Sequence, residues 1–355
     1  MSEDLNDKLQ KGTLPTDLQR DATPMNERAR QAAERLPPRI HTVKELLADA
    51  AQRATQRDKL ADACTTGHYE LDAVTGGFVP GFIWVFGADT SWGKSSFAIS
   101  VADENIQRGK RVLIVSAEDP ASLYGDRLLA RRARVSADRL RKGRLQPEEL
   151  QRVHDVRRKG EDVPVYCHAE NRPIERLRKE LEILIKLEGI HMVVFDYLQE
   201  FRSSGKHQDE RTRFKHTSQV MRDLLRSNNK GGAILSQLTI SGDTKIPSKH
   251  NIRESRDVSN AAEVICLGFT PDADVKGPSP GNNEQGRPLE PEILFKAGKR
   301  YVLVDKNKNG PRKKIVMDWD DNSACFNAVK DPEQERLDRE AAQYEHLVAD
   351  FQDGL

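Results

Sequence analysis

The stretch GFIWVFGADTSWGKSSFAISVA, residues 81–102, is the most informative part of this chain. It begins with an apolar run of the kind that forms a buried strand, and it ends with the apolar face of a helix. The loop between them closes with Gly93, Lys94 and Ser95. Gly93 would let backbone N–H groups approach phosphate oxygens, Lys94 would place a positive charge on the terminal phosphates, and Ser95 would offer a hydroxyl to Mg²⁺. The sequence therefore predicts a nucleotide site in this loop.

Ten residues in the loop and at its borders are candidates for binding the nucleotide. The usual pattern, G-x-x-x-x-G-K-[ST], is met except at its first position, where Ala88 stands and Gly87 lies one residue earlier. A chance Gly-Lys-Ser in an ordinary loop is the alternative, and the flanking strand and helix make it the weaker one. The candidates are Gly87, Ala88, Asp89, Thr90, Ser91, Trp92, Gly93, Lys94, Ser95 and Ser96.

Short apolar runs alternate with helical segments from about Gly67 onwards. Strands of this kind, separated by amphipathic stretches such as Ile174 to Leu187, are typical of an α/β domain whose sheet is covered on both faces. After a polar loop at 271–291, the chain is expected to form a strand, a hairpin and a further strand. The six earlier strands are predicted within FIWVFG, RVLIVSAE, VPVYCH, HMVVFD, GAILSQ and EVICLGF.

Polar side chains follow three of these apolar runs directly. Asp196 ends HMVVFD and could hold Mg²⁺ opposite Ser95, although an acid at a strand end is also common without any function. Glu118 and Asp119 follow RVLIVS, where a carboxylate could deprotonate the attacking water or simply face solvent. Gln237 ends GAILSQ, where an amide would meet the same edge of the sheet. The residues alone do not decide whether each of these polar side chains has a role in the site or is an ordinary polar residue at the end of a strand.

Composition excludes several classes of protein. The chain has 355 residues with 57 Lys and Arg against 56 Asp and Glu, so its net charge of +1 argues neither for nor against a nucleic-acid partner. No apolar run approaches the ~18–20 residues of a membrane span, and the N-terminus has no apolar signal-peptide core. The four cysteines show no metal-ligand spacing and are too few for a disulfide framework. We therefore expect buried thiols, a cytoplasmic protein (bacterial or infected host cytoplasm) and no membrane partner.

Taken in order, six blocks of the sequence resemble the C-terminal ATPase domain of the DnaB-type replicative hexameric helicases, which has a RecA-like fold. The resemblance covers about three-quarters of the chain, from about Thr65 to Asn327. It is carried by TGHYELDAVTGGFVPGFIWVFGADTSWGKSSFA, SAEDPASLYGDRLLARRARVS, HMVVFDYLQEF, LSQL, NIRES and VDKNKNGP. It implies a RecA-like core with a mostly parallel sheet flanked by helices, and helical extensions at both ends.

The resemblance also assigns roles. It implies that ATP binds between the subunits of a homo-oligomeric, hexameric ring, and that Ser95 and Asp196 hold Mg²⁺. It makes Glu118, rather than Asp119, the catalytic glutamate. It places a sensor at Gln237 and implies that ring helicases of this kind act on single-stranded DNA with a primase or a loader as partner. Lys308, assisted by Lys306, matches the basic hairpin that reaches the nucleotide of the neighbouring subunit.

The resemblance implies DNA contacts in the loop after Asp196, which faces the central channel of RecA-like rings. Residues 202–216 hold five basic residues and two acids, a net charge of +3 without the histidines. Contacts with phosphates there would be independent of sequence and sensitive to salt, and a solvated charged loop is the alternative. The candidates are Lys206, Arg211, Arg213 and Lys215, with Lys245 and Lys249 in the next loop as second choices.

Four segments are expected along the chain. Residues 1–40 are predicted to be weakly ordered. Residues 41–62 are predicted to form a linker helix, which either docks on an adjacent subunit or packs on its own domain. Residues 63–330 are predicted to form the ATPase domain, and residues 331–355 an acidic helix. Known family members carry a helical N-terminal domain of ~100 residues or more. Only about 60 residues precede the match here, so a phage- or plasmid-like version without that domain is expected.

Two departures from the family keep other functions open. Asp89 puts a negative charge in the phosphate loop, which would weaken triphosphate binding. Lys308 stands where the family usually has an arginine, and a lysine cannot bind a phosphate in a bidentate manner. An ATP-dependent DNA helicase or translocase of replication is the predicted function. A RecA-like ATPase of recombination or plasmid replication that does not unwind DNA is one alternative. A nucleotide-gated scaffold or helicase partner is the other.

Overall fold

The computed structural model describes the greater part of the chain. The described residues are 42–44, 47–48, 51, 63–239, 246–252, 262–277, 292–308, 310–333 and 336. The chain divides into two compact units, residues 1–57 and 58–355. In the first unit, residues 43–44, 47–48 and 51 are helical and the side chains of Val43 and Leu47 are exposed. The segment 1–40, most of the expected linker helix and most of the acidic helix at 331–355 lie outside the described residues.

An eight-stranded sheet forms the centre of the second unit, in the order β10-β9-β6-β1-β5-β4-β2-β3. The six strands from β6 to β3 are parallel, whereas β9 runs antiparallel to β6 and β10 antiparallel to β9. The strands are β1 (Ile83–Ala88), β2 (Val112–Ser116), β3 (Tyr166–His168), β4 (Met192–Asp196), β5 (Gly231–Gln237), β6 (Val264–Phe269), β9 (Tyr301–Asn307) and β10 (Lys314–Val316). All six apolar runs predicted as strands are confirmed.

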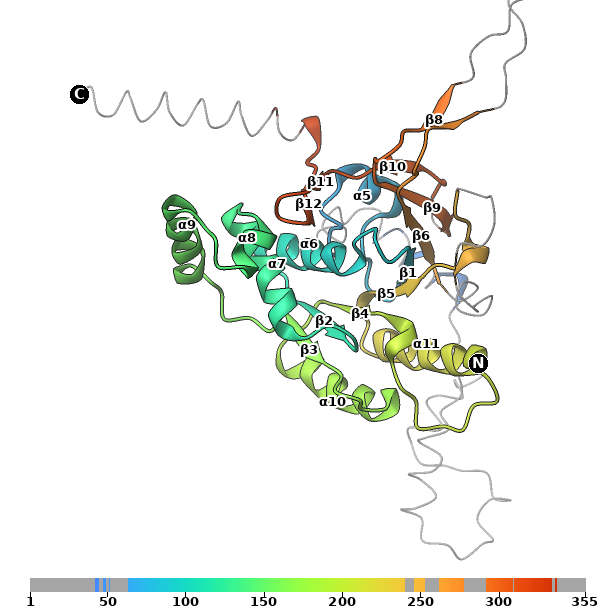
Figure 1. Ribbon diagram of the computed structural model, residues 1–355. Coiled ribbons are helices and arrows are strands. Elements are labelled where there is room, and N and C mark those ends of the chain that lie inside the picture. Colours follow the sequence, from blue (N-terminus) through green and yellow to red (C-terminus); the bar gives the residue numbers. More distant parts are fainter. Residues whose placement is uncertain are drawn as a thin grey trace, which may run out of the picture. The chain divides into compact units, whose positions relative to one another are not determined.

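Helices cover both faces of this sheet, as Figure 1 shows. Alternate strand residues separate into two apolar clusters: Trp84 and Phe86 pack with α6, while Ile83 and Val85 pack with α10 and α11. Period-two alternation explains this division, because successive side chains of a strand point to opposite faces. The helices are α5 (Tyr69–Thr75), α6 (Lys94–Gln107), α7 (Ala121–Ala133), α8 (Ala137–Arg141), α9 (Pro147–Arg158), α10 (Ile174–Leu187) and α11 (Glu210–Ser227). The predicted mostly parallel sheet with flanking helices is confirmed.

Short elements complete the described part of the unit. The turn η2 (Leu198–Glu200) follows β4, and η3 (Lys249–Asn251) follows the loop after β5. β7 (Val275–Lys276) pairs with β8 (Ile293–Phe295), and β11 (Trp319–Asp320) pairs with β12 (Cys325–Phe326). The second of these ribbons packs against α6, with the ring of Phe326 beside those of Trp92 and Phe97.

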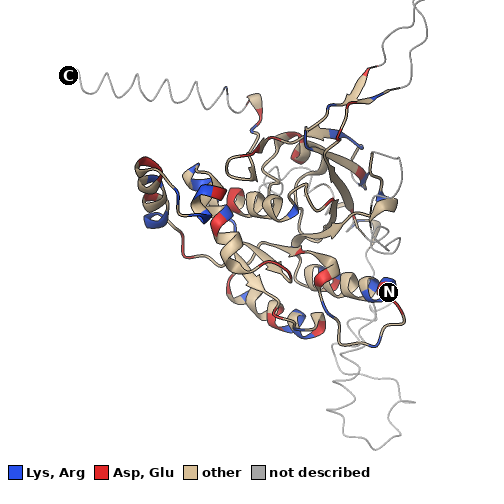
Figure 2. Ribbon diagram, viewed as in Figure 1, with Lys and Arg blue, Asp and Glu red and all other residues tan. Residues whose placement is uncertain are grey.

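Charged residues lie on the helices and loops, while the strands of the sheet are largely free of them (Figure 2). This distribution follows from burial, because a charged side chain inside the sheet layer would need a compensating partner. Within the described ranges, no helix combines the length and the apolar character needed to cross a membrane.

Candidate functional site

The predicted phosphate loop connects β1 to α6 at the carboxyl edge of the parallel strands. Gly93 ends the loop with a φ of 101°, a conformation that glycine adopts freely. A Cβ atom at Gly93 would lie 3.1 Å and 3.3 Å from two ring carbons of Trp319, so a larger residue would be both strained and crowded. Because α6 begins at Lys94, the first N–H groups of this helix face the loop without a partner inside the helix. The loop is therefore built to receive an anion.

Lys94 is buried at the base of the loop. Its Nζ donates hydrogen bonds to the carbonyl oxygens of Ala88 and Asp89, each at 3.1 Å. Burial lowers the pKa of Lys94, while the nearby carboxylates of Asp196, Asp89 and Glu118 raise it. The amine thus lies among oxygen atoms that phosphate oxygens could replace.

A cavity of about 220 Å³ opens at this edge of the sheet. It collects residues from the ends of β1, β2, β4 and β5, because the carboxyl ends of parallel strands meet at one edge. Seven predicted site residues line it, together with Asp119, which was the alternative to Glu118, and two residues that the sequence did not single out. The predicted ones are Thr90, Gly93, Lys94, Ser95, Ser96, Glu118 and Gln237; the two additional ones are Arg127 and Tyr197.

Glu118 and Asp119 differ in what their carboxylates contact. Asp119 Oδ2 accepts a hydrogen bond from Arg127 Nη1 at 3.3 Å. Within the described part of the chain, the carboxylate of Glu118 has no hydrogen bond or ion pair, and its backbone N–H donates to Ser116 Oγ at 3.3 Å. Burial raises the pKa of Glu118, and the neighbouring acids Asp119 and Asp196 raise it further. A free carboxylate with a raised pKa is suited to general-base catalysis, which favours Glu118 for that role.

Asp196 is the residue best placed for a metal ion. Its side chain is 2% exposed; Oδ2 accepts a hydrogen bond from the hydroxyl of Tyr124 at 2.5 Å, while the buried Oδ1 has no partner among the described residues. Burial raises the pKa of Asp196, while the hydrogen bond from Tyr124 and the charge of Lys94 lower it. An unpartnered buried carboxylate oxygen beside a serine hydroxyl fits Mg²⁺, which usually takes one or two protein oxygens and completes its shell with phosphates and water.

Five residues of the predicted nucleotide loop do not line the cavity. Gly87 and Ala88 are buried in β1, and Asp89 turns its carboxylate to the backbone N–H of Thr90 at 2.7 Å. Ser91 is exposed, and its carbonyl accepts a hydrogen bond from Arg300 at 3.1 Å. Trp92 is 1% exposed and packs against Phe86, Phe97 and Phe326. The carboxylate of Asp89 thus contacts the backbone of its own loop.

Two further side chains, Tyr124 and Arg127, act on the site from α7, and the sequence analysis did not identify them. They lie three residues apart on one helix face, with Tyr124 on Asp196 and Arg127 on Asp119. The signal that could have found them is the position of α7 directly after the acids that end β2. Tyr197 follows Asp196 and carries no signal of its own in the sequence.

Lys306 and Lys308 lie away from this cavity in their own chain. Asn307 pairs with Val264 at the start of β6, so the end of β9 lies at the edge of the sheet opposite to the phosphate loop. Lys308 Nζ contacts Glu263 Oε1 at 3.1 Å, and Arg226 binds the same oxygen at 2.9 Å. Neither lysine lines the cavity of its own subunit.

The candidate DNA contacts fall into three groups. Lys206, Arg211 and Lys215 are exposed, and Lys249 is half-buried in η3. Lys245 lies outside the described residues. Arg213 differs from the others, because its guanidinium points back to the carbonyl oxygens of Gln199 and Phe201. Its guanidinium is thus already bound to two backbone carbonyl oxygens, and its contact with a DNA phosphate stays a prediction.

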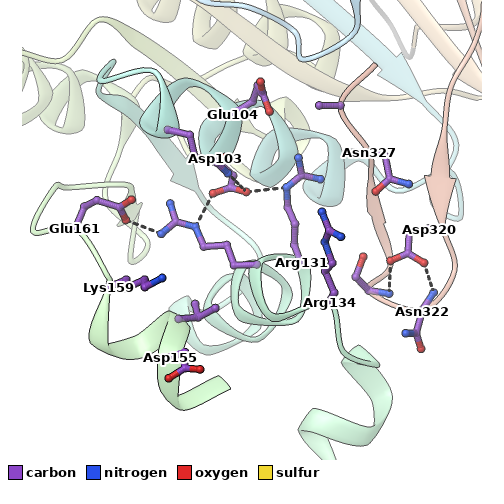
Figure 3. A pocket seen from close by; sticks show the side chains of 15 residues that line it. Asp103, Glu104, Arg131, Arg134, Asp155, Lys159, Glu161, Asp320, Asn322 and Asn327 are labelled. Atoms are coloured by element: carbon purple, nitrogen blue, oxygen red, sulfur yellow. Dashed lines mark hydrogen bonds and ion pairs between the residues drawn. The ribbon is translucent and has the colours of Figure 1, made fainter. Parts of the chain in front are cut away.

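A second cavity, of about 830 Å³, lies elsewhere among the described residues. Figure 3 shows Arg131 reaching Asp103 inside it, and Arg132 joins the same carboxylate at 2.6 Å. Its lining mixes arginines and a lysine with five acids, of which Asp103 and Glu161 are already paired. These internal ion pairs leave the cavity without a dominant charge for a nucleotide.

Comparison with known proteins identifies the family and the fold of the chain. Residues 63–328 match the family model of the DnaB-like helicase C-terminal domain. The replicative DNA helicase DnaB of Leifsonia xyli subsp. xyli is 25% identical over 272 residues, covering 75% of this chain and 56% of that protein. This chain thus spans little more than half the length of that relative.

Solved structures show the same fold. One of them, an isolated ATPase domain, aligns with a TM-score of 0.69 at 17% identity, covering 82% of this chain and all of that one. A DnaB-like replicative helicase, described with its interactions with primase, aligns with a TM-score of 0.67 at 16% identity and covers 92% of this chain and 74% of that one. The predicted RecA-like fold and the predicted family are confirmed. Because the family model matches three-quarters of its length, the chain belongs to the DnaB-like helicase C-terminal domain family.

Proposed function

We propose that this chain is an ATP-dependent, ring-forming DNA helicase or translocase that acts in replication. One observation carries the proposal: Lys94, Ser95, Glu118, Asp196 and Gln237 come from distant parts of the sequence and meet at one edge of the sheet. The relative named above is a replicative DNA helicase, and such proteins work on DNA in the cytoplasm, which is the location we propose.

The arrangement divides the chemistry of ATP hydrolysis among these residues. Glu118 accepts a proton from the attacking water, and Lys94 with the N–H groups of the loop stabilises charge on the transferring phosphoryl group. Gln237 contacts the nucleotide from the end of β5. Ser95 and Asp196 would hold Mg²⁺, which when bound neutralises charge on the phosphate oxygens.

Single-stranded DNA is the proposed polymer, contacted by Lys206, Arg211, Lys215, Lys245 and Lys249 in a hexameric ring. Of these, Lys206, Arg211 and Lys215 are exposed, and side chains of this kind supply phosphate contacts that do not depend on sequence. A primase is a proposed partner because a structural neighbour was described with one, and a loader remains a proposed partner on the family resemblance.

The test is ATP hydrolysis with and without single-stranded DNA, followed by strand separation of a forked duplex. We expect DNA to stimulate hydrolysis and the forked duplex to be unwound. Stimulated hydrolysis without unwinding would indicate the recombination-type ATPase instead. Nucleotide binding with negligible turnover in both conditions would indicate the scaffold and contradict the proposal.

Lys308, assisted by Lys306, is proposed to act on the nucleotide of the neighbouring subunit. Its place at the sheet edge opposite to its own phosphate loop supports this, because Lys308 cannot serve its own site from there. Lys308→Ala should reduce ATP turnover at least tenfold. It should cost less than about 1 kcal/mol of stability, because Glu263 keeps Arg226 and half-exposed ion pairs are weak.

Mixed rings provide the decisive measurement for Lys308. Subunits carrying Lys308→Ala keep Glu118, and subunits carrying Glu118→Gln keep Lys308, so co-assembled rings contain some interfaces with both groups intact. Their ATP turnover should exceed that of either variant alone. Arg312→Ala, which removes an exposed charge from the same hairpin, is the control. Confirmed co-assembly without rescue would show that Lys308 does not act in trans.

The helix within residues 41–62 is proposed to dock on an adjacent subunit. Val43 and Leu47 are 72% and 65% exposed and lie four residues apart, so two exposed apolar side chains share one helix face among the described residues. Deleting residues 1–60 should weaken the ring and leave the ATPase core folded. Light scattering that showed unchanged hexamers would contradict this role.

A further inference from the structure

Arg213 lies at the base of the loop 202–209, and its side chain is turned inward. Nη1 donates to the carbonyl oxygen of Phe201 at 2.9 Å, and Nη2 donates to that of Gln199 at 3.3 Å. The guanidinium also lies 4.5 Å from the ring centre of Phe214. Arg213 thus fastens the first turn of α11 to the segment that precedes the loop, and so closes the loop at its base.

The segment that Arg213 holds is itself connected to β5. Gln199 is 8% exposed; its Nε2 donates to Ser236 Oγ at 2.9 Å, and its Oε1 accepts from the backbone N–H of Gln237 at 3.2 Å. The orientation of the amide is fixed by its partners, because a backbone N–H can only be met by the oxygen. A displacement of Gln199 must therefore either move the end of β5 or break these two hydrogen bonds, of which the one to Ser236 is buried.

Gln237 lines the nucleotide cavity together with Lys94 and Glu118. A series of contacts hence runs from α11 through Arg213 and Gln199 to the cavity, and it starts on the helix that carries the exposed Arg211 two residues before Arg213.

We propose that Arg213 is a positioning residue that connects the loop 202–209 to Gln237 through Gln199, so that the position of the loop sets the position of Gln237 beside the nucleotide. This inference rests on the proposed function, in which Gln237 contacts ATP and the loop contacts DNA. It replaces the role expected for Arg213 from sequence, which was a direct contact with a DNA phosphate.

The geometry of arginine supplies a sharp test. Its planar fork can bind two carbonyl groups at once, whereas lysine keeps the charge but not the fork. Arg213→Lys should therefore fail if Arg213 is a positioning residue, and should work nearly as well as the native protein if Arg213 serves as a charge for a phosphate. Gln199→Leu removes the second connection in the series and should have the same effect. Arg176→Lys on α10, a 72% exposed arginine paired with Glu180, is the control.

Two measurements decide the matter in the full chain. For Arg213→Lys and Gln199→Leu, we expect the stimulation of ATP hydrolysis by single-stranded DNA to fall at least tenfold. The affinity for DNA and its dependence on salt concentration should stay within twofold of the native values. We also expect faster amide hydrogen exchange at the end of β5 in these two variants, and no such change in Arg176→Lys.

The proposal is overturned if Arg213→Lys keeps the native stimulation of ATP hydrolysis by DNA and the native amide exchange at the end of β5. It is also overturned if Arg213→Lys binds DNA more weakly and the dependence of its DNA affinity on salt concentration is reduced by the equivalent of about one phosphate contact. Failure of the proposed function looks different, because then the native protein itself shows no stimulation by DNA. The exchange measurement needs no ATP turnover, so in that case it still decides whether Arg213 and Gln199 hold the end of β5.

Discussion

Replacing Lys94 by alanine is expected to abolish ATP turnover and leave the fold intact. Lys94 is the cation at the base of the phosphate loop, with its Nζ on the carbonyls of Ala88 and Asp89. Removing it takes away the charge that stabilises the transferring phosphoryl group. Loss of one such group typically lowers kcat by about 100- to 1,000-fold, and we expect a loss in that range or larger.

Steady-state ATP hydrolysis and circular dichroism measure the two parts of this prediction. Lys159→Ala is the matched control, because Lys159 lines the separate 830 Å³ cavity and should leave turnover unchanged. A Lys94→Ala protein that hydrolysed ATP at nearly the native rate would remove the nucleotide site from this loop, and with it the proposed function.

Glu118→Gln is expected to retain binding of ATP with Mg²⁺ and to lose about 100- to 10,000-fold in turnover, the usual contribution of a general base. The amide keeps the size of the side chain but cannot accept the proton of the attacking water. Burial and neighbouring acids raise the pKa of Glu118 above the ordinary 4.5. Turnover requires the deprotonated form, so the native rate should fall as the pH drops through this raised pKa.

Asp119→Asn separates the two adjacent acids. Asp119 binds Arg127 at the cavity wall and its backbone carbonyl accepts a hydrogen bond from Tyr166, so its carboxylate has a structural partner already. We expect a loss of less than about tenfold, well below the range of a missing general base. Single-turnover measurements of both variants give the ranking, and a larger loss for Asp119→Asn would assign the base to Asp119.

Local sequence pattern was sufficient to predict the strands of the parallel sheet and the loop between β1 and α6. Runs such as HMVVFD and GAILSQ could be recognised as strands because a strand buried on both faces is apolar throughout. Asp196, Glu118 and Gln237 could be located at strand ends by this pattern, but only the resemblance to the helicase family assigned them roles in one site; the structure brings them to one edge because the carboxyl ends of parallel strands meet there. The parallel topology of the sheet thus explains why residues at separate strand ends lie at one edge.

The directions of the long side chains could be learned only from the packed molecule. Arg211 and Arg213 look equivalent in the sequence, yet Arg211 is exposed while Arg213 binds the carbonyls of Gln199 and Phe201. Tyr124 likewise contacts Asp196 across 72 residues of sequence. Such contacts depend on how segments that are distant in the chain pack together. An arginine or tyrosine side chain has several rotamers, and the packing around it selects one of them.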